Sequence, residues 1–338
     1  MTKPRILVIG TGSVGKRHAT NLIALGCSIS GVDPRRDRRQ EFESIDGVAT
    51  SYESVGAAFD GSDYDGVVIA TPPILHIPQS AEVLAVQDVP LLIEKPLATT
   101  LSAAREWSVG LERPERILVG YTWRWSRALR HIRELLKSRR IGEFLHARGI
   151  MSSHLEDWHP WERYQDFYMS QAALGGGALL DESHWIDLFL WLLGRPTGLF
   201  ATVGKISALE IDADDNVDVL LMYSSGRTAY LHLDLFGRPH ETSLQIVGSQ
   251  GRIDWSERSG VVSVSLHASP NPEEFHFPDS RNEMFASLAR EFLELVLGKR
   301  AELTCSISDG LAALAVIDAA RESQRQKARA LISIAESE

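Results

Sequence analysis

Cysteine is scarce in this chain of 338 residues, which contains two, Cys27 and Cys305. Two cysteines cannot build the disulfide framework of a small secreted scaffold, and the sequence has no C-x-x-C pair. A basic surplus is also lacking, because the formal net charge is −10. Without excess positive charge to displace counterions, the chain is a poor candidate for nonspecific nucleic-acid binding.

Long hydrophobic runs are missing as well. No apolar stretch approaches the roughly 20 residues of a membrane-spanning helix, and we find no internal repeat or low-complexity segment. We expect no signal peptide, because the first predicted strand begins by Arg5. These absences predict a cytoplasmic protein in a reducing compartment, with neither a membrane nor a nucleic acid as partner. The length allows two domains with full cores.

A glycine-rich turn follows the first apolar run, residues 5–9, which is typical of a buried parallel strand. Gly10, Gly12 and Gly15 fit G-x-G-x-x-G: a tight turn, close approach of a pyrophosphate, and close packing of the next helix. That helix begins near Val14, and Ser13 and Val14 would turn their N–H groups toward the phosphates. The turn therefore predicts dinucleotide binding, with a structural glycine turn as the weaker alternative.

An acidic residue ends the second predicted strand, at residues 29–32. Asp33 would accept hydrogen bonds from the adenosine ribose. Arg35 or Arg36 could stack on adenine or meet a 2′-phosphate, although both also suit a solvated helix start. Because Asp33 would repel a 2′-phosphate, the sequence favours NAD over NADP.

Two further predicted strands end in polar residues that would border the cofactor, since ligands of open α/β sheets bind beyond the carboxyl ends of strands. Residues 65–70 lead into Thr71, Pro72 and His76, and residues 89–93 lead into Glu94 and Lys95. A lysine beside the nicotinamide can hydrogen-bond a substrate hydroxyl and take part in proton transfer. The alternatives are a proline-started helix for the first segment and a surface charge for Lys95.

Candidate substrate contacts lie further along the chain. Arg124 could contact substrate or cofactor, or form a salt bridge at a domain junction. The aromatic segment 152–168 is too rich in rings for a plain linker, and Trp158, Trp161 and Tyr168 could stack on a pyranose ring. Packing against a sheet or a subunit contact is the equally weighted alternative.

A run of three glycines, residues 175–177, precedes a predicted buried helix that ends at Gly194. Asp181, His184 and Asp187 follow at steps of three, so they would share one side of it. Ionisable groups aligned on a buried helix are costly unless they are satisfied or used. We therefore favour a catalytic site over satisfied core residues, and see no need for a metal.

These motifs together resemble the glucose–fructose oxidoreductase/inositol dehydrogenase (Gfo/Idh/MocA) family. The resemblance rests on the glycine loop ending in His18, on residues 70–76, on Glu94-Lys95-Pro96 and on the segment 175–187. It implies a nicotinamide-dependent oxidoreductase, with the family's lysine, aspartate and histidine at Lys95, Asp181 and His184. Two departures exist: two residues separate Asp181 from His184, where the family commonly has three, and Thr122 replaces an asparagine.

The predicted fold is an α/β Rossmann domain (parallel sheet, helices on both faces) at residues 1–122. An α+β domain with a large, mostly antiparallel sheet follows at residues 123–338. Six period-two runs between residues 202 and 266 would form that sheet, and the last helices would pack back on the first domain. A second subunit commonly covers an open sheet face, so we expect a homodimer or homotetramer.

The predicted function is hydride transfer between NAD(P) and a hydroxyl or carbonyl carbon of a sugar, sugar acid, cyclitol or nucleotide sugar. Lys95 would polarise the oxygen, His184 would act as general acid/base, and Asp181 would orient His184 or bind a hydroxyl. The alternatives are an internally recycled NAD that supports elimination or hydrolysis on a sugar, and a non-catalytic NAD(P)-binding sensor.

Overall fold

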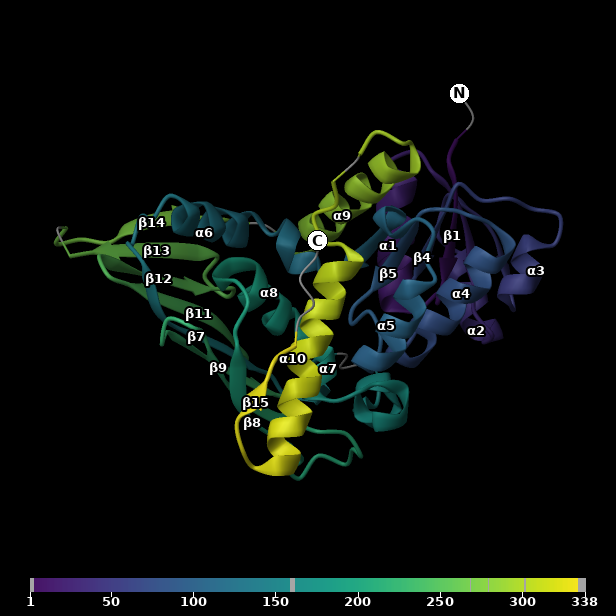
Figure 1. The fold of residues 1–338 in the computed structure, drawn as a ribbon. Helices are drawn as coiled ribbons and strands as arrows, with labels where there is room; N and C mark the ends of the chain where they lie inside the picture. Colours follow the sequence, from purple (N-terminus) through teal and green to yellow (C-terminus); the bar gives the residue numbers. More distant parts are fainter. Residues whose placement is uncertain (1–2, 159–161, 268, 279, 301, 334–338) are drawn as a thin grey trace. The chain divides into compact units, whose positions relative to one another are not determined.

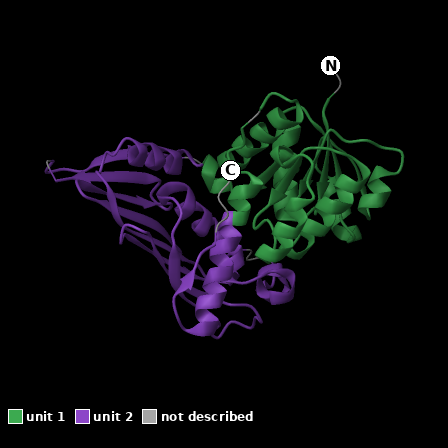
Figure 2. Cartoon of the chain, in the orientation of Figure 1, with its two compact units in different colours: residues 1–125, 280–311 green, residues 126–279, 312–338 purple. Residues whose placement is uncertain are grey.

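The computed structural model describes residues 3–158, 162–267, 269–278, 280–300 and 302–333. The chain forms two compact units (Figure 2), which are described separately below. Unit 1 comprises Met1–Trp125 and Ser280–Leu311, and unit 2 comprises Ser126–Asp279 and Ala312–Glu338. The predicted boundary after residue 122 falls within η3 (Thr122–Trp125), just before the chain leaves unit 1.

Unit 1 is built on a six-stranded parallel sheet with the order β3-β2-β1-β4-β5-β6. Figure 1 labels its strands β1, β4 and β5. Its strands are β1 (Arg5–Ile9), β2 (Ser28–Val32), β3 (Val48–Tyr52), β4 (Gly66–Ile69), β5 (Leu91–Glu94) and β6 (Ile117–Gly120). In the central strand β1, the side chains from Ile6 to Ile9 are at most 1% exposed, as a parallel strand covered on both faces requires. This strand order is that of the doubly wound Rossmann fold and confirms the predicted class.

Helices cover both faces of this sheet. They are α1 (Ser13–Ala24), α2 (Arg36–Glu43), α3 (Val55–Phe59), α4 (His76–Val86), α5 (Leu101–Val109) and α9 (Arg281–Val296), with the short turns η1 (Pro73–Leu75) and η2 (Pro114–Arg116). The crossovers β1-α1-β2 and β4-α4-β5 run in opposite directions from the sheet centre, so right-handed connections place α1 and α4 on opposite faces. The crevice where the strand order reverses therefore lies between β1 and β4. α9 packs beside α1.

Unit 2 contains a nine-stranded sheet with the order β14-β13-β12-β11-β7-β10-β9-β8-β15. The strands are β7 (Phe144–Ser152), β8 (Gly198–Gly204), β9 (Asn216–Met222), β10 (Thr228–Asp234), β11 (Glu241–Gly248), β12 (Gly251–Ser256), β13 (Val261–Leu266), β14 (Glu273–His276) and β15 (Ala330–Leu331). Neighbours are antiparallel except β7 and β10. The mostly antiparallel sheet is confirmed, but the sequence prediction lacked β7, β14 and β15.

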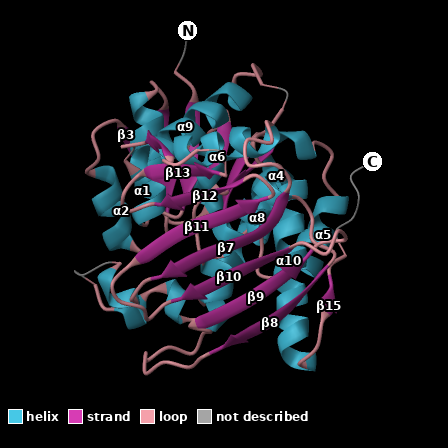
Figure 3. Cartoon of the chain, turned by 90° about the vertical axis from the view of Figure 1, so that its left-hand side faces the viewer, coloured by secondary structure: helices cyan, strands magenta, loops and turns pink. Residues whose placement is uncertain are grey.

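Buried and half-buried side chains alternate along the central strand β10. On β10, Ala229, Leu231 and Leu233 are fully buried, whereas Tyr230 and His232 are half-buried on the other face. The helices of this unit are α6 (Arg127–Lys137), α7 (Ala178–Asp181), α8 (Ser183–Leu193) and most of α10 (Ile307–Gln326), with turns η4 (Leu155–Asp157), η5 (Tyr164–Asp166), η6 (Tyr168–Ser170) and η7 (Ala172–Leu174). Figure 3 shows strands β7 to β11 face-on, with the described helices of unit 2 behind them.

A polar cluster lies on this open face around His232. Its Nδ1 is 2.8 Å from Asp218 Oδ1, its Nε2 is 3.0 Å from Asp234 Oδ2, and the Tyr230 hydroxyl donates to Asp218 at 2.6 Å. Hydrogen bonding to Asp234 and Asp218 outweighs burial and raises the pKa of His232 to about 9.

Among the described residues, no helix combines the length and apolarity needed to cross a membrane.

Candidate functional site

The glycine turn of unit 1 has a backbone that larger residues could not adopt. Gly10 has a φ of +90° and donates its N–H to Val32 O at 2.8 Å. A Cβ on Gly15 would lie 1.9 Å from Gly10 O, so α1 crosses the end of β1 at a distance that glycine alone permits. Gly12 is less confined, and the nearest atom to its hypothetical Cβ is Arg38 Nη1 at 3.3 Å.

The N-terminus of α1 is suited to an anion. Gly12 is its N-cap residue, and no side chain caps the helix in the described part of the chain. The first N–H groups of α1, from Ser13 and Val14, can therefore serve an anionic ligand, with the helix dipole adding to the attraction. The residues present fit the pyrophosphate of a dinucleotide, and their contact with it stays a prediction.

Asp33 is held at the carboxyl end of β2 by three hydrogen bonds. Its Oδ2 accepts from the main-chain N–H and the hydroxyl of Thr11, at 3.1 and 3.2 Å, and its Oδ1 accepts from Arg35 N–H at 3.0 Å. The residue is 4% exposed. The carboxylate is thus fixed beside the glycine turn and keeps lone pairs for a ribose hydroxyl.

Arg35 and Arg36 are exposed at the start of α2, as in the solvated helix start, and their contact with adenine or a 2′-phosphate stays a prediction. Arg35 forms an exposed ion pair with Asp37 at 2.5 Å, and Arg39 donates to Asp33 O at 2.8 Å. Arg38, which sequence reasoning missed, brings its guanidinium to the glycine turn beside Gly12. The sequence contained one signal for Arg38, because a helix that begins at Arg36 has residue 38 in its first turn.

His76 joins the loops that follow β4 and β5. Its Nδ1 lies 2.8 Å from Pro96 O and its Nε2 lies 2.8 Å from Thr71 O, and the side chain is fully buried. Burial lowers the pKa of this imidazole despite the two carbonyls. Thr71 and Pro72 remain half-buried at the strand end, whereas the ring of His76 is enclosed and holds main chain.

Lys95 follows the last residue of β5 and is half-buried. Its predecessor Glu94 is 7% exposed and turns inward, where its Oε1 is 2.7 Å from His18 Nε2 on α1. The Glu94 Oε2 accepts from the Lys95 main-chain N–H at 3.2 Å. Lys95 therefore stands on a turn whose neighbouring side chain is anchored in the core of unit 1.

Arg124 is 4% exposed and has partners inside unit 1. Its guanidinium donates to Thr304 O at 2.9 Å and to Asp309 Oδ1 at 3.0 Å. These contacts correspond to the structural alternative, an ion pair that joins η3 to the start of α10. A substrate contact by Arg124 stays a prediction.

In unit 2 the three glycines before α7 fit tightly against their surroundings. Gly175 and Gly177 have φ values of +85° and +104°. A Cβ on Gly176 would lie 2.4 Å from Tyr168 O, and one on Gly177 would lie 2.4 Å from Asp214 Oδ1. The glycines therefore let the aromatic segment and Asp214 approach the main chain, an explanation that lies within unit 2.

The predicted single helix after these glycines is wrong in one respect, because it is divided into α7 and α8 at Glu182. Trp185 N–H bonds to Glu182 O, one residue closer than the α-helical pattern. Asp181 thus belongs to α7, and His184 and Asp187 belong to α8. Residues at steps of three indicate that one side of a helix is buried. They do not show whether its main-chain hydrogen bonds continue without a break, because that depends on tertiary packing.

Asp181 is buried, at 3% exposure, and its Oδ1 accepts from the Tyr168 hydroxyl at 2.5 Å. Asp214, another residue that sequence reasoning missed, accepts from Leu179 N–H at 2.8 Å and so caps α7. Burial raises the pKa of Asp214, which its hydrogen bond to Leu179 opposes. Asp214 therefore positions the helix that carries Asp181.

The other candidates of unit 2 are distributed as follows. His184 is half-buried and Asp187 is fully buried on α8. Trp158 is half-buried and donates its Nε1–H to Ser153 Oγ at 2.9 Å, while Trp161 lies outside the described residues. Lys95 is part of unit 1, so the joint action of Lys95 with Asp181 and His184 stays a proposal.

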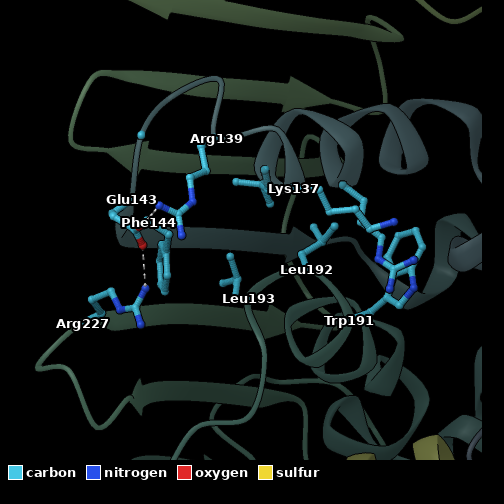
Figure 4. Close-up of a pocket in the computed structure, with 11 residues that line it drawn as sticks. Lys137, Arg139, Glu143, Phe144, Trp191, Leu192, Leu193 and Arg227 are labelled. Carbon is cyan, nitrogen blue, oxygen red and sulfur yellow. Dashed lines mark ion pairs between the residues drawn. The ribbon is translucent and has the colours of Figure 1, made fainter.

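A cavity of about 310 Å³ in unit 2 contains none of the predicted site residues (Figure 4). Four cations line it, Arg133, Lys137, Arg139 and Arg227, together with Glu143 and aromatic rings. Glu143 pairs with Arg139 at 3.1 Å and with Arg227 at 3.8 Å, and Arg133 lies 4.6 Å from the Trp191 ring centroid. Lys137 pairs with Glu134 at 2.8 Å, so all four cations have local partners.

Comparison with known families assigns both parts of the chain. The oxidoreductase family with an NAD-binding Rossmann fold (Gfo/Idh/MocA) matches residues 4–121, and the Gfo/Idh/MocA C-terminal domain matches residues 129–254. The chain belongs to the Gfo/Idh/MocA family and is an NAD(P)-dependent oxidoreductase. This confirms the resemblance that the sequence motifs indicated.

Individual relatives are distant but cover nearly the whole chain. The rhizopine catabolism protein MocA of Rhizobium meliloti is 26% identical, with 95% of each chain covered. An inositol 2-dehydrogenase of Rhizobium meliloti (strain 1021) is also 26% identical, over 98% of this chain and 99% of that protein. Levoglucosan dehydrogenase, solved with NADH, is 18% identical with a TM-score of 0.87, over 99% of this chain and 100% of that one. This last likeness shows the fold.

Proposed function

We propose that this enzyme transfers a hydride between NAD and a hydroxyl or carbonyl carbon of a sugar, sugar acid, cyclitol or nucleotide sugar. The observation that carries the proposal is the arrangement in unit 1. There the glycine turn, Asp33 and Lys95 all follow strand ends at one edge of one parallel sheet. The names of the relatives add support for a polyol or sugar substrate.

Asp33 supports NAD as the preferred cofactor. A buried carboxylate at the end of β2 can accept hydrogen bonds from ribose hydroxyls and would repel a 2′-phosphate. Arg38 beside Gly12 provides a cation for the pyrophosphate. Fluorescence titration should give a lower Kd for NADH than for NADPH, and Asp33→Ala should narrow that difference. Equal affinities in the unaltered protein would refute the preference.

The bound nicotinamide would supply the hydride acceptor or donor, and the remaining work falls to side chains. Lys95 would hold the substrate oxygen and stabilise the negative charge that grows on it as its proton leaves. His184 would take or return that proton, a task suited to an imidazole at neutral pH. Asp181, held by Tyr168, would orient His184 or bind a neighbouring hydroxyl.

The test of this function is the absorbance of reduced nicotinamide when the protein and NAD meet a panel of sugars, sugar acids, cyclitols and nucleotide sugars. We expect one class to give a signal and Lys95→Met to lower turnover by about 10²–10⁴-fold. The matched control is Lys299→Met, which removes an exposed lysine of the same unit. An unchanged rate in Lys95→Met would refute its role. Binding of NAD with silence across the panel would favour a recycled cofactor or a sensor.

We further propose that the open face of the nine-stranded sheet covers a second copy of the chain, giving a homodimer or homotetramer. Phe200 on β8 and Leu220 on β9 are paired in register and are 46% and 38% exposed on that face. Light scattering should show an oligomer that Leu220→Glu dissociates, whereas Val109→Glu, an exposed control in unit 1, should not. A monomer at micromolar concentration would overturn this proposal.

A further inference from the structure

His18 lies on α1, one turn beyond the glycine turn, and is fully buried. Its Nε2 is 2.7 Å from Glu94 Oε1. Its Nδ1 is buried and has no hydrogen-bond partner among the residues that the structure describes. On α9, the ring of Phe285 packs edge-on against the imidazole with the centroids 5.5 Å apart.

This setting selects one tautomer of His18. A proton on Nδ1 would be a buried donor without an acceptor, which costs more than an acceptor nitrogen left unused. The proton therefore belongs on Nε2, from which it is donated to the Glu94 carboxylate. His18 thus donates from Nε2 to a buried carboxylate, and a neighbouring aromatic ring fixes its orientation.

Glu94 connects His18 to the predicted catalytic lysine. While Oε1 accepts from His18, Oε2 accepts from the Lys95 main-chain N–H at 3.2 Å. The carboxylate also lies against β6, because a Cβ on Gly120 would be 3.2 Å from Glu94 Oε1. The Glu94 side chain consequently has one position, set from α1, β5 and β6.

The ionisation of Glu94 depends on these neighbours. Burial raises the pKa of this carboxyl group, but the hydrogen bond and charge interaction with His18, the Lys95 ammonium and the Lys95 N–H together lower it by more, so the net shift is downward. The other titratable groups that interact with it are Arg17 on α1 and His76 on α4. Without the hydrogen bond from His18, the effect of burial, which raises the pKa of Glu94, would meet less opposition.

We propose that His18 is a positioning residue for Lys95, which acts by keeping Glu94 ionised and folded against the main chain of that lysine. The inference rests on the proposed function, in which Lys95 touches the substrate. Helix α1 would then have two roles. Its N-terminus would bind the pyrophosphate, and its second turn, through His18 and Glu94, would fix the main chain of Lys95. Protonation of Glu94 would remove the anion beside Lys95 and make His18 Nε2 accept a hydrogen bond, so that the imidazole proton would move to Nδ1, where it has no acceptor among the described residues.

The test compares two amides at position 18. In His18→Gln the amide nitrogen can reach the position of Nε2, whereas in His18→Asn it falls short. We expect His18→Gln to keep the pH profile of kcat, and His18→Asn to move its acid limb upward by about one pH unit or more. At a pH on that limb, kcat should fall about tenfold with little change in the KM for NAD. A purely structural defect would instead lower kcat at every pH by the same factor.

A second measurement separates this inference from the proposed function. In protein labelled with ¹³C at the glutamate carboxyl carbons, the Glu94 resonance is assigned by its loss in Glu94→Gln. It should titrate at higher pH in His18→Asn than in the unaltered protein or in His18→Gln. If His18→Asn does not fold, His18→Phe, which keeps an aromatic ring but has no donor, replaces it.

The outcomes are distinct. Titration of Glu94 at the same pH in all variants overturns the inference, whatever the activity. A shifted titration with turnover that does not depend on Lys95 refutes the proposed function and leaves the His18–Glu94 link standing as a property of the fold. A shifted titration without a shifted acid limb overturns the positioning role.

Discussion

Gly15 is the position at which a single added methyl group should impair both folding and cofactor binding. A Cβ there would lie 1.9 Å from Gly10 O and 3.3 Å from Val8 Cγ1. The first distance falls about 1.5 Å short of the 3.4 Å at which ordinary contact begins. Because the obstructing atom is main chain at the end of a buried strand, no side-chain rotation can relieve the clash. In Gly15→Ala, α1 must move away from β1.

The cost follows from that displacement. Overpacking of a core costs about 1–3 kcal/mol, and a clash with main chain belongs at the upper end, about 3 kcal/mol. With a urea dependence of about 3 kcal/mol per M for a unit of this size, the unfolding midpoint of unit 1 should fall by roughly 1 M. The N-terminus of α1 would also be displaced from the pyrophosphate, so the Kd for NADH should rise at least tenfold.

Gly12→Ala is the matched control. The backbone of Gly12 has a φ of −67°, and the nearest atom is the end of a flexible arginine side chain at 3.3 Å. The free energy of unfolding of Gly12→Ala should therefore change by no more than about 0.5 kcal/mol. The added methyl would nevertheless stand where the pyrophosphate approaches, so NADH binding should weaken about tenfold. An unchanged midpoint in Gly15→Ala would refute the packing argument, and unchanged NADH affinity in Gly12→Ala would refute the pyrophosphate site.

Three further predictions concern other parts of the chain. The raised pKa of His232 contributes stability that is complete below the ordinary pKa near 6.5 and is lost as pH rises through about 9. The free energy of unfolding should therefore fall by up to about 2 kcal/mol between pH 6.5 and 10. In urea titrations, His232→Asn should flatten this pH dependence. Tyr168→Phe removes the donor to buried Asp181, which should cost about 1–3 kcal/mol in unit 2 and lower kcat; equal stability would show that another group replaces the hydroxyl. Arg124→Met should lower the melting temperature and leave the substrate KM unchanged, whereas a raised KM with normal melting would support the substrate contact instead.

The sequence predicted those strands whose burial produces a regular pattern of apolar residues. The apolar runs of β1, β4 and β5 are buried on both faces and read as parallel strands, and β9 to β13 alternate because one face is open. The sequence analysis did not predict β7, because the alternation of its side chains is interrupted at Gly149. Trp185 and Phe189 of α8 occupy the space that a side chain there would need. β15, with two residues, is too short for any period.

The same limit explains what the sequence could say about the site. Motif spacing placed His76 and Glu94 at strand ends, where a dinucleotide would lie, and polar residues there predict ligand contacts. In the structure, the ring of His76 faces two carbonyl oxygens and Glu94 accepts from His18 and from main chain.

A spacing reports which strand end carries a polar group, but not the direction in which its side chain turns. That direction depends on partners far away in the sequence, such as Gly120 beside Glu94, which leave no local pattern. A turn that must present a lysine to a ligand needs its own backbone fixed first. Buried imidazoles and a buried carboxylate fix it through hydrogen bonds, so polar residues near such a site divide into those that meet the ligand and those that hold the residues that do.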